Sequence, residues 1–413
     1  MKKWLHRWVL YERTGVFLKG WRKASFLVVS VVMIFASEWL GKSVLVEPAA
    51  KWHMDAQIRK RDKQQEQVTR IVRIDPEDHA TIFGGRSPLS AVALVNAACS
   101  LATRGASVVV VDLDTSSPLA FPADARLRFK LPRSPVPIIW AADSEWVSNE
   151  DGQLEQRGDL VLGGLVNEPT YGVARMPLDF DGLVRRWSRF EKVAGQWRPT
   201  LVWAAVRAAC RSAPRDGCPD EETLQTEPSA DMSSEKSPPP AMTVDYDFLP
   251  IRLSDFMGQT APAEFPRICE AAAVDPRLAG RIVVLGGFYS REDRHDTPWG
   301  TRESARLVAM AIEEAFHGGP MHKLADPVKW MLKLLLALLI ACIHHWVRPV
   351  AATALTIGGL LPAAVLVSGE LAFRFGYDVG VVVFGLGILI EQLLAGAERA
   401  NELARELEKR SRR

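Results

Sequence analysis

Cysteine is scarce in this chain, with five among 413 residues. So few cysteines exclude a small fold that depends on a dense set of disulfide bonds. Cys342 lies in an apolar run, and Cys99 and Cys269 lie in segments with a helical pattern, so we predict that the latter two belong to a hydrophobic core. Only Cys210 and Cys218, which flank a short polar stretch, are candidates for a disulfide bond.

Sequence motifs of catalysis are missing as well. The chain has no G-x-S-x-G, no H-E-x-x-H, no phosphate-binding G-x-x-x-x-G-K and no C-x-x-C. We therefore expect a protein that is not an enzyme and that needs no cofactor. An enzyme that faces outward and uses Asp293 and His295 is the least favoured alternative.

The chain also lacks an excess of one charge. Its 51 Lys and Arg residues nearly balance its 49 Asp and Glu residues, which leaves a formal net charge of +2. The basic residues stand beside apolar runs instead of forming one patch, and this distribution argues against a nucleic-acid partner.

Long apolar runs, by contrast, are plentiful. Each is close to the roughly 20 residues that a helix needs to cross a bilayer. The first has no clear cleavage site for a signal peptidase, so we interpret it as a retained anchor. A buried helical bundle is the alternative for the last three. The four runs are residues 24–46, 328–347, 349–373 and 379–395.

Lys and Arg gather before the first run and after the last one. This distribution predicts that both termini are cytoplasmic, in the inner membrane of a bacterium. The expected organisation is a basic N-terminus at 1–23, a transmembrane helix at 24–46, an extracytoplasmic domain at 47–327, transmembrane helices at 328–347, 349–373 and 379–395, and a cytoplasmic tail at 396–413.

Between the first and second runs, short apolar strands alternate with amphipathic helices. This order predicts an α/β domain with a central, mostly parallel sheet flanked by helices. Residues 212–242 contain few large apolar side chains and are predicted to be a disordered insertion. The strands are expected at 70–74, 107–111, 136–142, 160–165 and 282–285, and the helices at 91–102, 199–210, 266–273 and 302–316.

Acidic residues follow three of the predicted strands. Because the carboxyl ends of parallel strands meet at one edge of a sheet, these side chains predict a ligand-binding site. The alternative is that each acid caps a helix or holds a loop, and a metal site is a weaker possibility. The candidates are Asp75, Asp112, Asp114, Asp293, His295 and Asp296.

Charged residues interrupt two of the apolar runs. Glu38 and Lys42 lie in the first run, and Lys329 and Lys333 lie in the second. An ionised side chain within a bilayer is costly unless it has a partner. Glu38 either pairs with Lys42 one turn further along its own helix or meets Lys333 or Lys329 between helices.

Five segments of the extracytoplasmic region resemble, in order and spacing, the type-two CHASE domain. This family of extracellular sensory domains is associated with bacterial cyclases and histidine kinases. The resemblance covers about residues 68–321, and the three closing apolar runs also match. It implies an α/β sensor that passes a signal inward. The segments are IVRID at 71–75, RSPLS at 86–90, GASVVVVDLD at 105–114, DFDGLVRRW at 179–187 and GRIVVLGGFYSREDRHDTPWG at 280–300.

The expected function combines this resemblance with the topology. We expect a membrane sensor that detects an envelope or external signal and relays it through its membrane helices. The chain departs from the family pattern in its insertion at 212–242 and in its short tail at 396–413, which cannot hold a kinase or cyclase. The output is therefore assigned to a separate membrane or envelope protein. The other expected partner is the lipid bilayer, and a homo-oligomer is left open. The alternative is a structural or assembly subunit of an envelope complex that uses the domain as a docking surface.

Overall fold

The chain divides into two units, one of residues Arg61–Pro320 and one of Met1–Lys60 with Met321–Arg413. The computed structural model describes residues 67–113, 115, 131–148, 154–160, 171–179, 181–193, 195–225, 242, 246–257, 268–290, 293–318, 322–323, 326–347, 351, 354–360, 362–364, 366–367 and 377–378.

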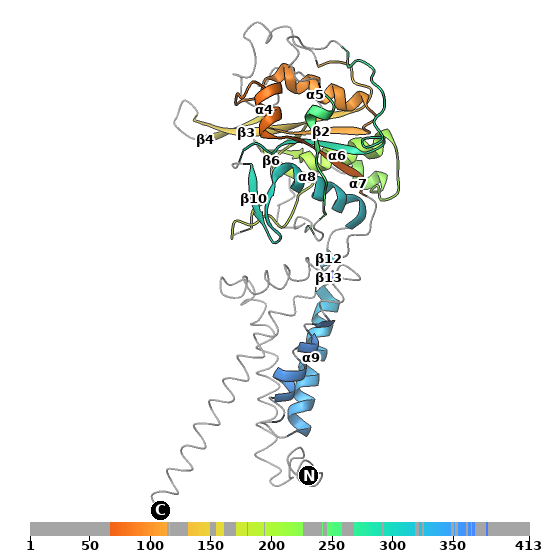
Figure 1. The fold of residues 1–413 in the computed structure, drawn as a ribbon. Coiled ribbons are helices and arrows are strands. Elements are labelled where there is room, and N and C mark those ends of the chain that lie inside the picture. The colour runs from red at the N-terminus through yellow and green to blue at the C-terminus, as the bar shows by residue number, and fades with distance from the viewer. Residues whose placement is uncertain are drawn as a thin grey trace, which may run out of the picture. The chain divides into compact units, whose positions relative to one another are not determined.

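A seven-stranded sheet forms the centre of the first unit (Figure 1). Its strand order is β4-β3-β2-β9-β1-β8, with β5 also paired to β3. All pairs are parallel except β3 and β4, which form an antiparallel hairpin. The expected central, mostly parallel sheet is confirmed. The strands are β1 Thr69–Ile74, β2 Val108–Asp112, β3 Ile138–Ser148, β4 Leu154–Leu160, β5 Tyr171–Val173, β8 Ile251–Arg252 and β9 Ile282–Gly287.

The two central strands β2 and β9 are buried along their whole length. Both are continuous apolar runs rich in valine, a pattern typical of parallel strands that are covered on both faces. Val109 pairs with Val283 and Val110 with Val284, so successive side chains point alternately to two helical layers.

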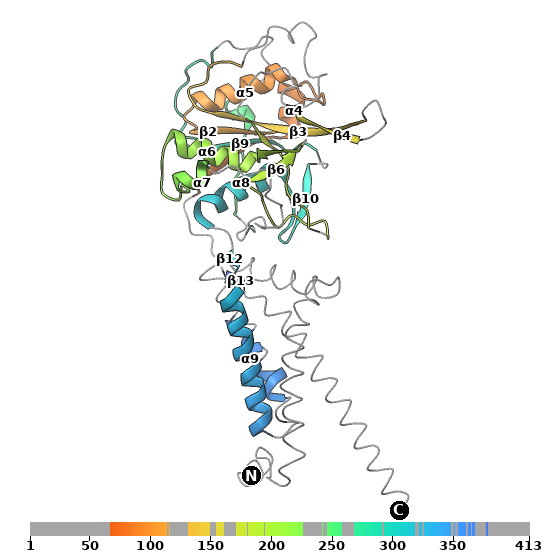
Figure 2. The ribbon, with the colours of Figure 1, turned by 180° about the vertical axis from the view of Figure 1, so that it is seen from behind.

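Helices cover both faces of the sheet (Figure 2). Val109 and Val111 pack with α4 and α5 on one face, whereas Val108 and Val110 pack with α6 and α8 on the other. The unit therefore has three layers with a core on each side of the sheet. The helices are α4 Pro76–Ile82, α5 Ala91–Thr103, α6 Leu201–Ser212 and α8 Ser304–Glu313.

Two antiparallel hairpins lead into the helices of the second layer. The β6–β7 hairpin precedes α6, and the β10–β11 hairpin precedes α8. Their placement brings loop residues to the starts of both helices. The remaining elements of the unit are β6 Phe190–Val193, β7 Gln196–Pro199, β10 Arg294–Thr297, β11 Gly300–Glu303, α7 Glu221–Gln225, the 3-10 turn η4 Leu253–Asp255 and the π-helical turn η5 Glu314–Gly318.

Two disulfide bonds are present among the described residues. Cys210 is bonded to Cys218, with their Cα atoms 5.8 Å apart. Cys99 is bonded to Cys269, with a Cα–Cα distance of 5.0 Å. Cys99 and Cys269 are both buried, as predicted, but the expectation that only Cys210 and Cys218 are candidates for a disulfide bond is wrong. The two residues are 170 positions apart in the sequence, so local patterns do not reveal the bond. Only folding brings α5, which contains Cys99, close to the segment that contains Cys269.

The predicted helix at 266–273 is also wrong where the structure describes it. Ile268 forms a parallel bridge with Arg133, and residues 269–275 are not helical. The Cys269 amide donates to the Arg133 carbonyl at 3.1 Å, and the bond to Cys99 holds the same residue. These contacts favour an extended chain over a helix.

The predicted disordered insertion at 212–242 is folded in its first part. Helix α7 lies within it, and Leu224 of α7 is buried in the core beside α6. The Cys210–Cys218 bond ties the start of this segment to α6. One leucine and one disulfide bond thus order a stretch whose composition alone favours disorder. Residues 226–241 lie outside the described part.

The second unit contains the 21-residue helix α9, Asp326–Trp346. It also contains the π-helical turn η6, Thr356–Leu360, and the parallel pair of β12, His322–Lys323, with β13, Tyr377–Asp378. In the part of the chain that the structure describes, no helix has both the length and the apolar character needed to cross a membrane. The predicted spans at 24–46 and 379–395, with Glu38 and Lys42, lie outside the described residues, whereas Lys329 and Lys333 lie on α9.

Candidate functional site

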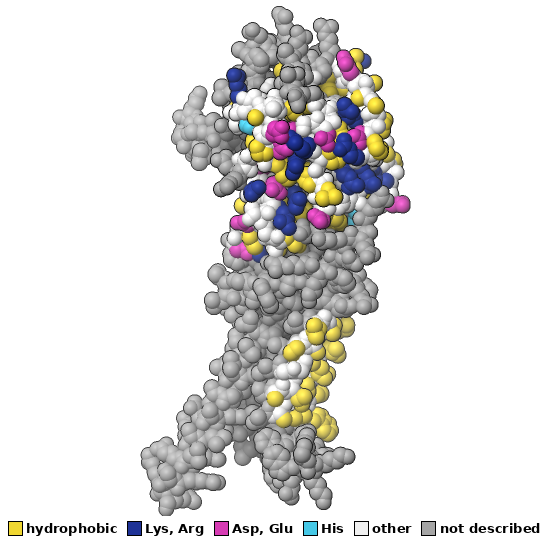
Figure 3. Space-filling model, in the orientation of Figure 1, with side chains coloured by type: hydrophobic (Ala, Val, Ile, Leu, Met, Phe, Trp, Pro, Cys, Tyr) yellow, Lys and Arg dark blue, Asp and Glu magenta, His cyan; other side chains and the backbone are white. Residues whose placement is uncertain are grey.

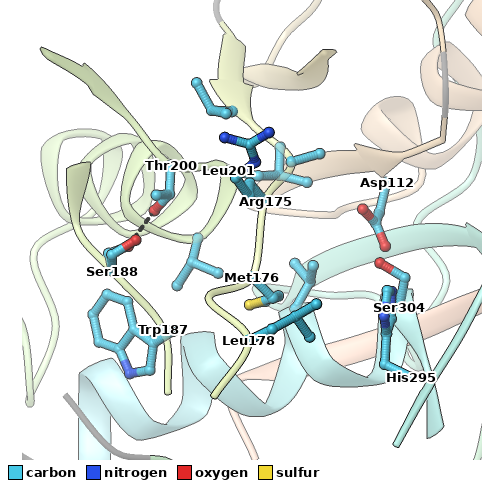
Figure 4. Close-up of a pocket in the computed structure, with 14 residues that line it drawn as sticks. Asp112, Arg175, Met176, Leu178, Trp187, Ser188, Thr200, Leu201, His295 and Ser304 are labelled. Atoms are coloured by element: carbon cyan, nitrogen blue, oxygen red, sulfur yellow. Dashed lines mark hydrogen bonds between the residues drawn. The ribbon is translucent and has the colours of Figure 1, made fainter. Parts of the chain in front are cut away.

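A cavity of about 230 Å³ opens at the carboxyl end of the sheet, on the face covered by α6 and α8 (Figure 4). The end of β2, the segment after β5, the first turns of both helices and the β10 strand contribute to its wall. The lining residues are Asp112, Val173, Ala174, Arg175, Met176, Leu178, Trp187, Ser188, Thr200, Leu201, Val202, His295, Ser304 and Val308.

Two glycines bring the helix starts against the sheet. A Cβ atom at Gly286 would lie 2.2 Å from Cβ of Ala305, and one at Gly172 would lie 2.5 Å from Cα of Leu201. Only glycine permits such close approach of a strand and a helix. Gly286 is the register partner of Asp112, so the first turn of α8 lies directly beside the Asp112 side chain.

Asp112 is a buried carboxyl group in the wall of this cavity, with 6% of its surface exposed. Burial raises the pKa of Asp112 to about 6, against a hydrogen bond with Ser304 that lowers it. Figure 4 shows the carboxylate directed toward Ser304. Its Oδ2 atom makes no hydrogen bond to any residue that the structure describes. The carboxylate is therefore only partly satisfied.

Asp293 lies next to this group. Its backbone carbonyl accepts a hydrogen bond from the Ser304 amide at 3.0 Å, which fixes the loop after β9 to the start of α8. Burial, together with the charges of Asp112 and Glu303, raises the pKa of Asp293 to about 7. Glu303 itself lies 3.5 Å from the guanidinium of Arg294. The start of α8 thus gathers three mutually repelling carboxyl groups.

His295 lines the same cavity from β10. Burial lowers the pKa of His295, against the charge of Asp296, so the imidazole is mainly neutral at neutral pH. Asp296 itself accepts a hydrogen bond from the Thr301 hydroxyl at 2.8 Å, across the β10–β11 hairpin. Asp296 therefore stabilises the hairpin that carries His295.

The comparison with known families adds to this geometry. The CHASE2 domain family matches residues 26–343 of the 413-residue chain. The chain belongs to the CHASE2 family. The family is one of extracellular sensory domains, and this assignment is consistent with a sensor role. No curated protein and no solved structure matches the chain.

Asp75 has a different place in this CHASE2 domain. It caps α4, accepting hydrogen bonds from the amides of Glu77 at 3.0 Å and Asp78 at 2.9 Å. Its other oxygen lies 2.8 Å from Nε of Arg252. Asp75 thus has the capping role that the sequence left open, and it does not line the cavity. Asp114 lies outside the described residues. The structure brings together Asp112, Asp293 and His295.

Several lining residues of the CHASE2 domain were not predicted from the sequence. Arg175, Met176 and Leu178 follow β5 in an irregular segment, and Trp187 ends the segment DFDGLVRRW. Within that segment, buried Arg185 pairs with Asp179 at 3.1 Å and Asp181 at 2.8 Å. Irregular segments carry no periodic signal. The available signal was one glycine in each neighbouring strand, Gly172 in β5 and Gly286 in β9, which marks a close approach to a helix.

A metal ion needs several converging ligands. Among the residues that the structure describes, no group of three or more His, Cys, Asp and Glu side chains could hold one. The cavity combines one partly satisfied acid with a mainly apolar wall, an arrangement that suits a small organic molecule.

Proposed function

We propose that this CHASE2 protein is a membrane-anchored sensor that binds a small molecule in the cavity beside Asp112. The proposal rests on the Oδ2 atom of Asp112, which has no hydrogen-bond partner among the residues that the structure describes. An unsatisfied buried carboxylate destabilises a fold, and such groups concentrate at functional sites. A neutral side chain of the same shape would make the domain more stable. Binding of a ligand that pairs with Asp112 would explain why an ionisable carboxylate is present at this position.

Helix α8 supports the relay of a signal. Ser304 and Val308 in its first turns line the cavity, and its last residue, Glu313, passes into η5. The chain then continues through residues 319–325 to α9. A ligand that shifts the start of α8 therefore acts on the element that leads toward the second apolar run. A helix of ten residues transmits such a shift over about 15 Å.

Anchoring in a bacterial inner membrane is part of the proposal and is supported by the sequence and by the exposed apolar side chains of α9, although no described helix has the length and apolar character of a span. Large apolar side chains of α9 are exposed, among them Met331 at 61% and Leu335 at 63%. Figure 3 shows apolar side chains along the described part of this helix, whereas basic and acidic side chains are interspersed on the described face of the sensor domain. The basic residues that flank the four apolar runs favour cytoplasmic termini. A separate protein then supplies the output.

The proposal is tested by ligand screening with the full chain in detergent. A compound that binds the folded state raises the midpoint of thermal unfolding. Met176 lies at the centre of the cavity wall in Figure 4. Met176→Trp should fill the cavity and abolish the shift, whereas Leu249→Trp, at a site that is 84% exposed, should preserve it. Binding that survives Met176→Trp would show that the sensor site lies elsewhere.

A docking subunit is the second candidate. The exposed side chains of Leu249, Ile268 and Val274, with 84%, 61% and 65% of their surfaces accessible, favour contact with another protein. Purification from native membranes separates the two functions. Stable co-purification of one partner that no small molecule affects would favour the docking subunit.

A further inference from the structure

We infer that the cavity binds a small organic amine, a cation with an apolar body, whose ammonium group pairs with Asp112. This inference rests on the proposed function of the cavity as a sensor site. It adds the chemical class of the ligand.

The charges beside Asp112 favour a cation at that end of the cavity, although Arg175 also lines the cavity wall. The Oδ2 atom of Asp112 is buried and has no hydrogen-bond partner among the described residues, and the charges of Asp112 and Glu303 raise the pKa of Asp293. The Arg294 guanidinium beside them lies against Glu303 at 3.5 Å. His295 adds little positive charge, because its burial favours the neutral ring. An ammonium group would neutralise the acidic side of the cavity and donate a hydrogen bond to the Asp112 carboxylate.

An anion fits the same place poorly, although two helices begin there. The first turn of α6 is already capped, because the Thr200 hydroxyl accepts from the Trp203 amide at 3.3 Å. At the start of α8, the Ser304 amide donates to the Asp293 carbonyl. An anion at α8 would also face the carboxyl groups of Asp112 and Asp293. Repulsion from these groups opposes the attraction of the helix dipole.

The other residues that line the cavity favour a ligand with an apolar carbon skeleton. Val173, Met176, Leu178, Trp187 and Val202 contribute carbon surface to the cavity. In Figure 4, Trp187 and Asp112 lie on opposite sides of Met176. A ligand with its amine at Asp112 thus extends its carbon skeleton toward the indole ring. Arg175 also lines the cavity and is exposed, so it is available to a carboxylate on the same ligand.

The first experiment compares probe molecules that share a phenylalkyl skeleton and differ in the polar group at its end. The full chain in detergent is heated with phenethylamine, 2-phenylethanol or 3-phenylpropionate, each at the same millimolar concentration and pH 7.5. We expect the amine alone to raise the unfolding midpoint, by at least about 2 °C. Phenylalanine tests whether Arg175 binds a carboxylate on the same ligand as the amine. If phenylalanine raises the unfolding midpoint more than phenethylamine does, an amino acid is the preferred amine. An equal or larger shift with the alcohol or the acid overturns the inference, as does no shift with either amine.

The second experiment assigns the effect to Asp112. Asp112→Asn removes a buried charge while it keeps the shape, so the variant without ligand should unfold at the same or a higher temperature than the parent. Phenethylamine should no longer raise the unfolding midpoint of this variant. Asp216→Asn, the same substitution at an exposed acid, should leave both values unchanged. A full amine shift in a folded Asp112→Asn variant contradicts the inference.

These results also separate the inference from the proposed function. Amines could leave the unfolding midpoint unchanged while another class of compound raises it, and Met176→Trp could abolish that rise. In that case the ligand is not an amine, but the cavity is still the sensor site. If Met176→Trp leaves every shift intact, the cavity is not the sensor site, and the inference fails with it.

Discussion

Glu313 is a second carboxyl group that the fold buries, at the end of α8 away from the cavity. It accepts hydrogen bonds from the Thr69 amide at 2.7 Å and from the Thr69 hydroxyl at 2.6 Å. Burial raises the pKa of Glu313 to about 7, although these hydrogen bonds and the charge of Arg281 lower it. The group thus couples the last turn of α8 to the first residue of β1.

This geometry predicts a pH-dependent effect of Glu313→Gln. Because the folded-state pKa lies above the ordinary value of 4.5, the contribution of Glu313 to stability is complete below pH 4.5 and is lost as the pH rises through about 7. The glutamine keeps a neutral acceptor for Thr69. It should raise the free energy of unfolding by about 3 kcal/mol at pH 8 and change it little at pH 4.5.

Urea unfolding at both pH values measures this difference. Glu270→Gln, the same substitution at an exposed site, is the control and should show no dependence on pH. An equal effect of Glu313→Gln at pH 4.5 and pH 8 would mean that the carboxyl group does not titrate with the fold.

Part of the site could be predicted at the scale of single residues. Asp112 and Asp293 follow apolar strands, and the rule that strand ends converge was enough to select them and His295. The same rule selected Asp75, which caps α4, because an acid at a strand end also suits the start of the next helix. Ser304 and Trp187 could not be predicted, since neither the spacing nor the residue type distinguishes them from surface positions.

At the scale of the elements, the contact between β9 and α8 determines the shape of the cavity. Gly286→Ala would place its Cβ atom 2.2 Å from Cβ of Ala305 and push the start of α8 away from Asp112. We expect a loss of about 1–3 kcal/mol of stability and a loss of ligand binding. Adding Ala305→Gly removes the opposing methyl group and should restore much of both. A double variant as impaired as Gly286→Ala would show that the close approach is not the cause.

The two disulfide bonds close loops of very different length, with separations of 8 and 170 residues. In the chain-entropy model, they stabilise the fold by about 2.5 and about 5 kcal/mol, respectively. Cys218→Ser should therefore lower the urea midpoint less than Cys269→Ser. Mass mapping of the unreduced protein should recover both disulfide-linked peptide pairs. Free thiols at these four positions in protein from an oxidising compartment would contradict the pairing.

The regular elements were predictable to different degrees, for physical reasons. The valine-rich runs of β2 and β9 leave no alternative to buried strands, and α5, α6 and α8 have apolar faces at helical spacing. Segment 266–273 has similar apolar residues, but a long-range disulfide bond and a bridge to Arg133 override its local preference. Contacts between distant segments are not encoded in local periodicity, so this error could not be avoided.

At the scale of the whole molecule, the match to the CHASE2 family covers the first apolar run, the α/β domain and most of α9. The resemblance inferred from five short segments is therefore confirmed as a family assignment. The membrane topology stays a prediction that rests on the flanking charges.

Reporter fusions test this topology. A fusion after Arg413 should be active only with a cytoplasmic reporter, and a fusion at Ser233 only with a periplasmic one. The basic residues before the first run and after the last one give this expectation. Cytoplasmic activity at Ser233 would place the domain on the other side of the membrane and overturn the sensor orientation.

The Cys99–Cys269 bond also turns the middle of the chain into a covalent ring. A protease that cuts once between these two positions opens the ring and releases no fragment. The piece with the first apolar run and the piece with the last three would still migrate as one molecule on a gel without reductant, and as two with it. A molecule nicked in this way keeps its two ends covalently joined until a reductant reaches the bond.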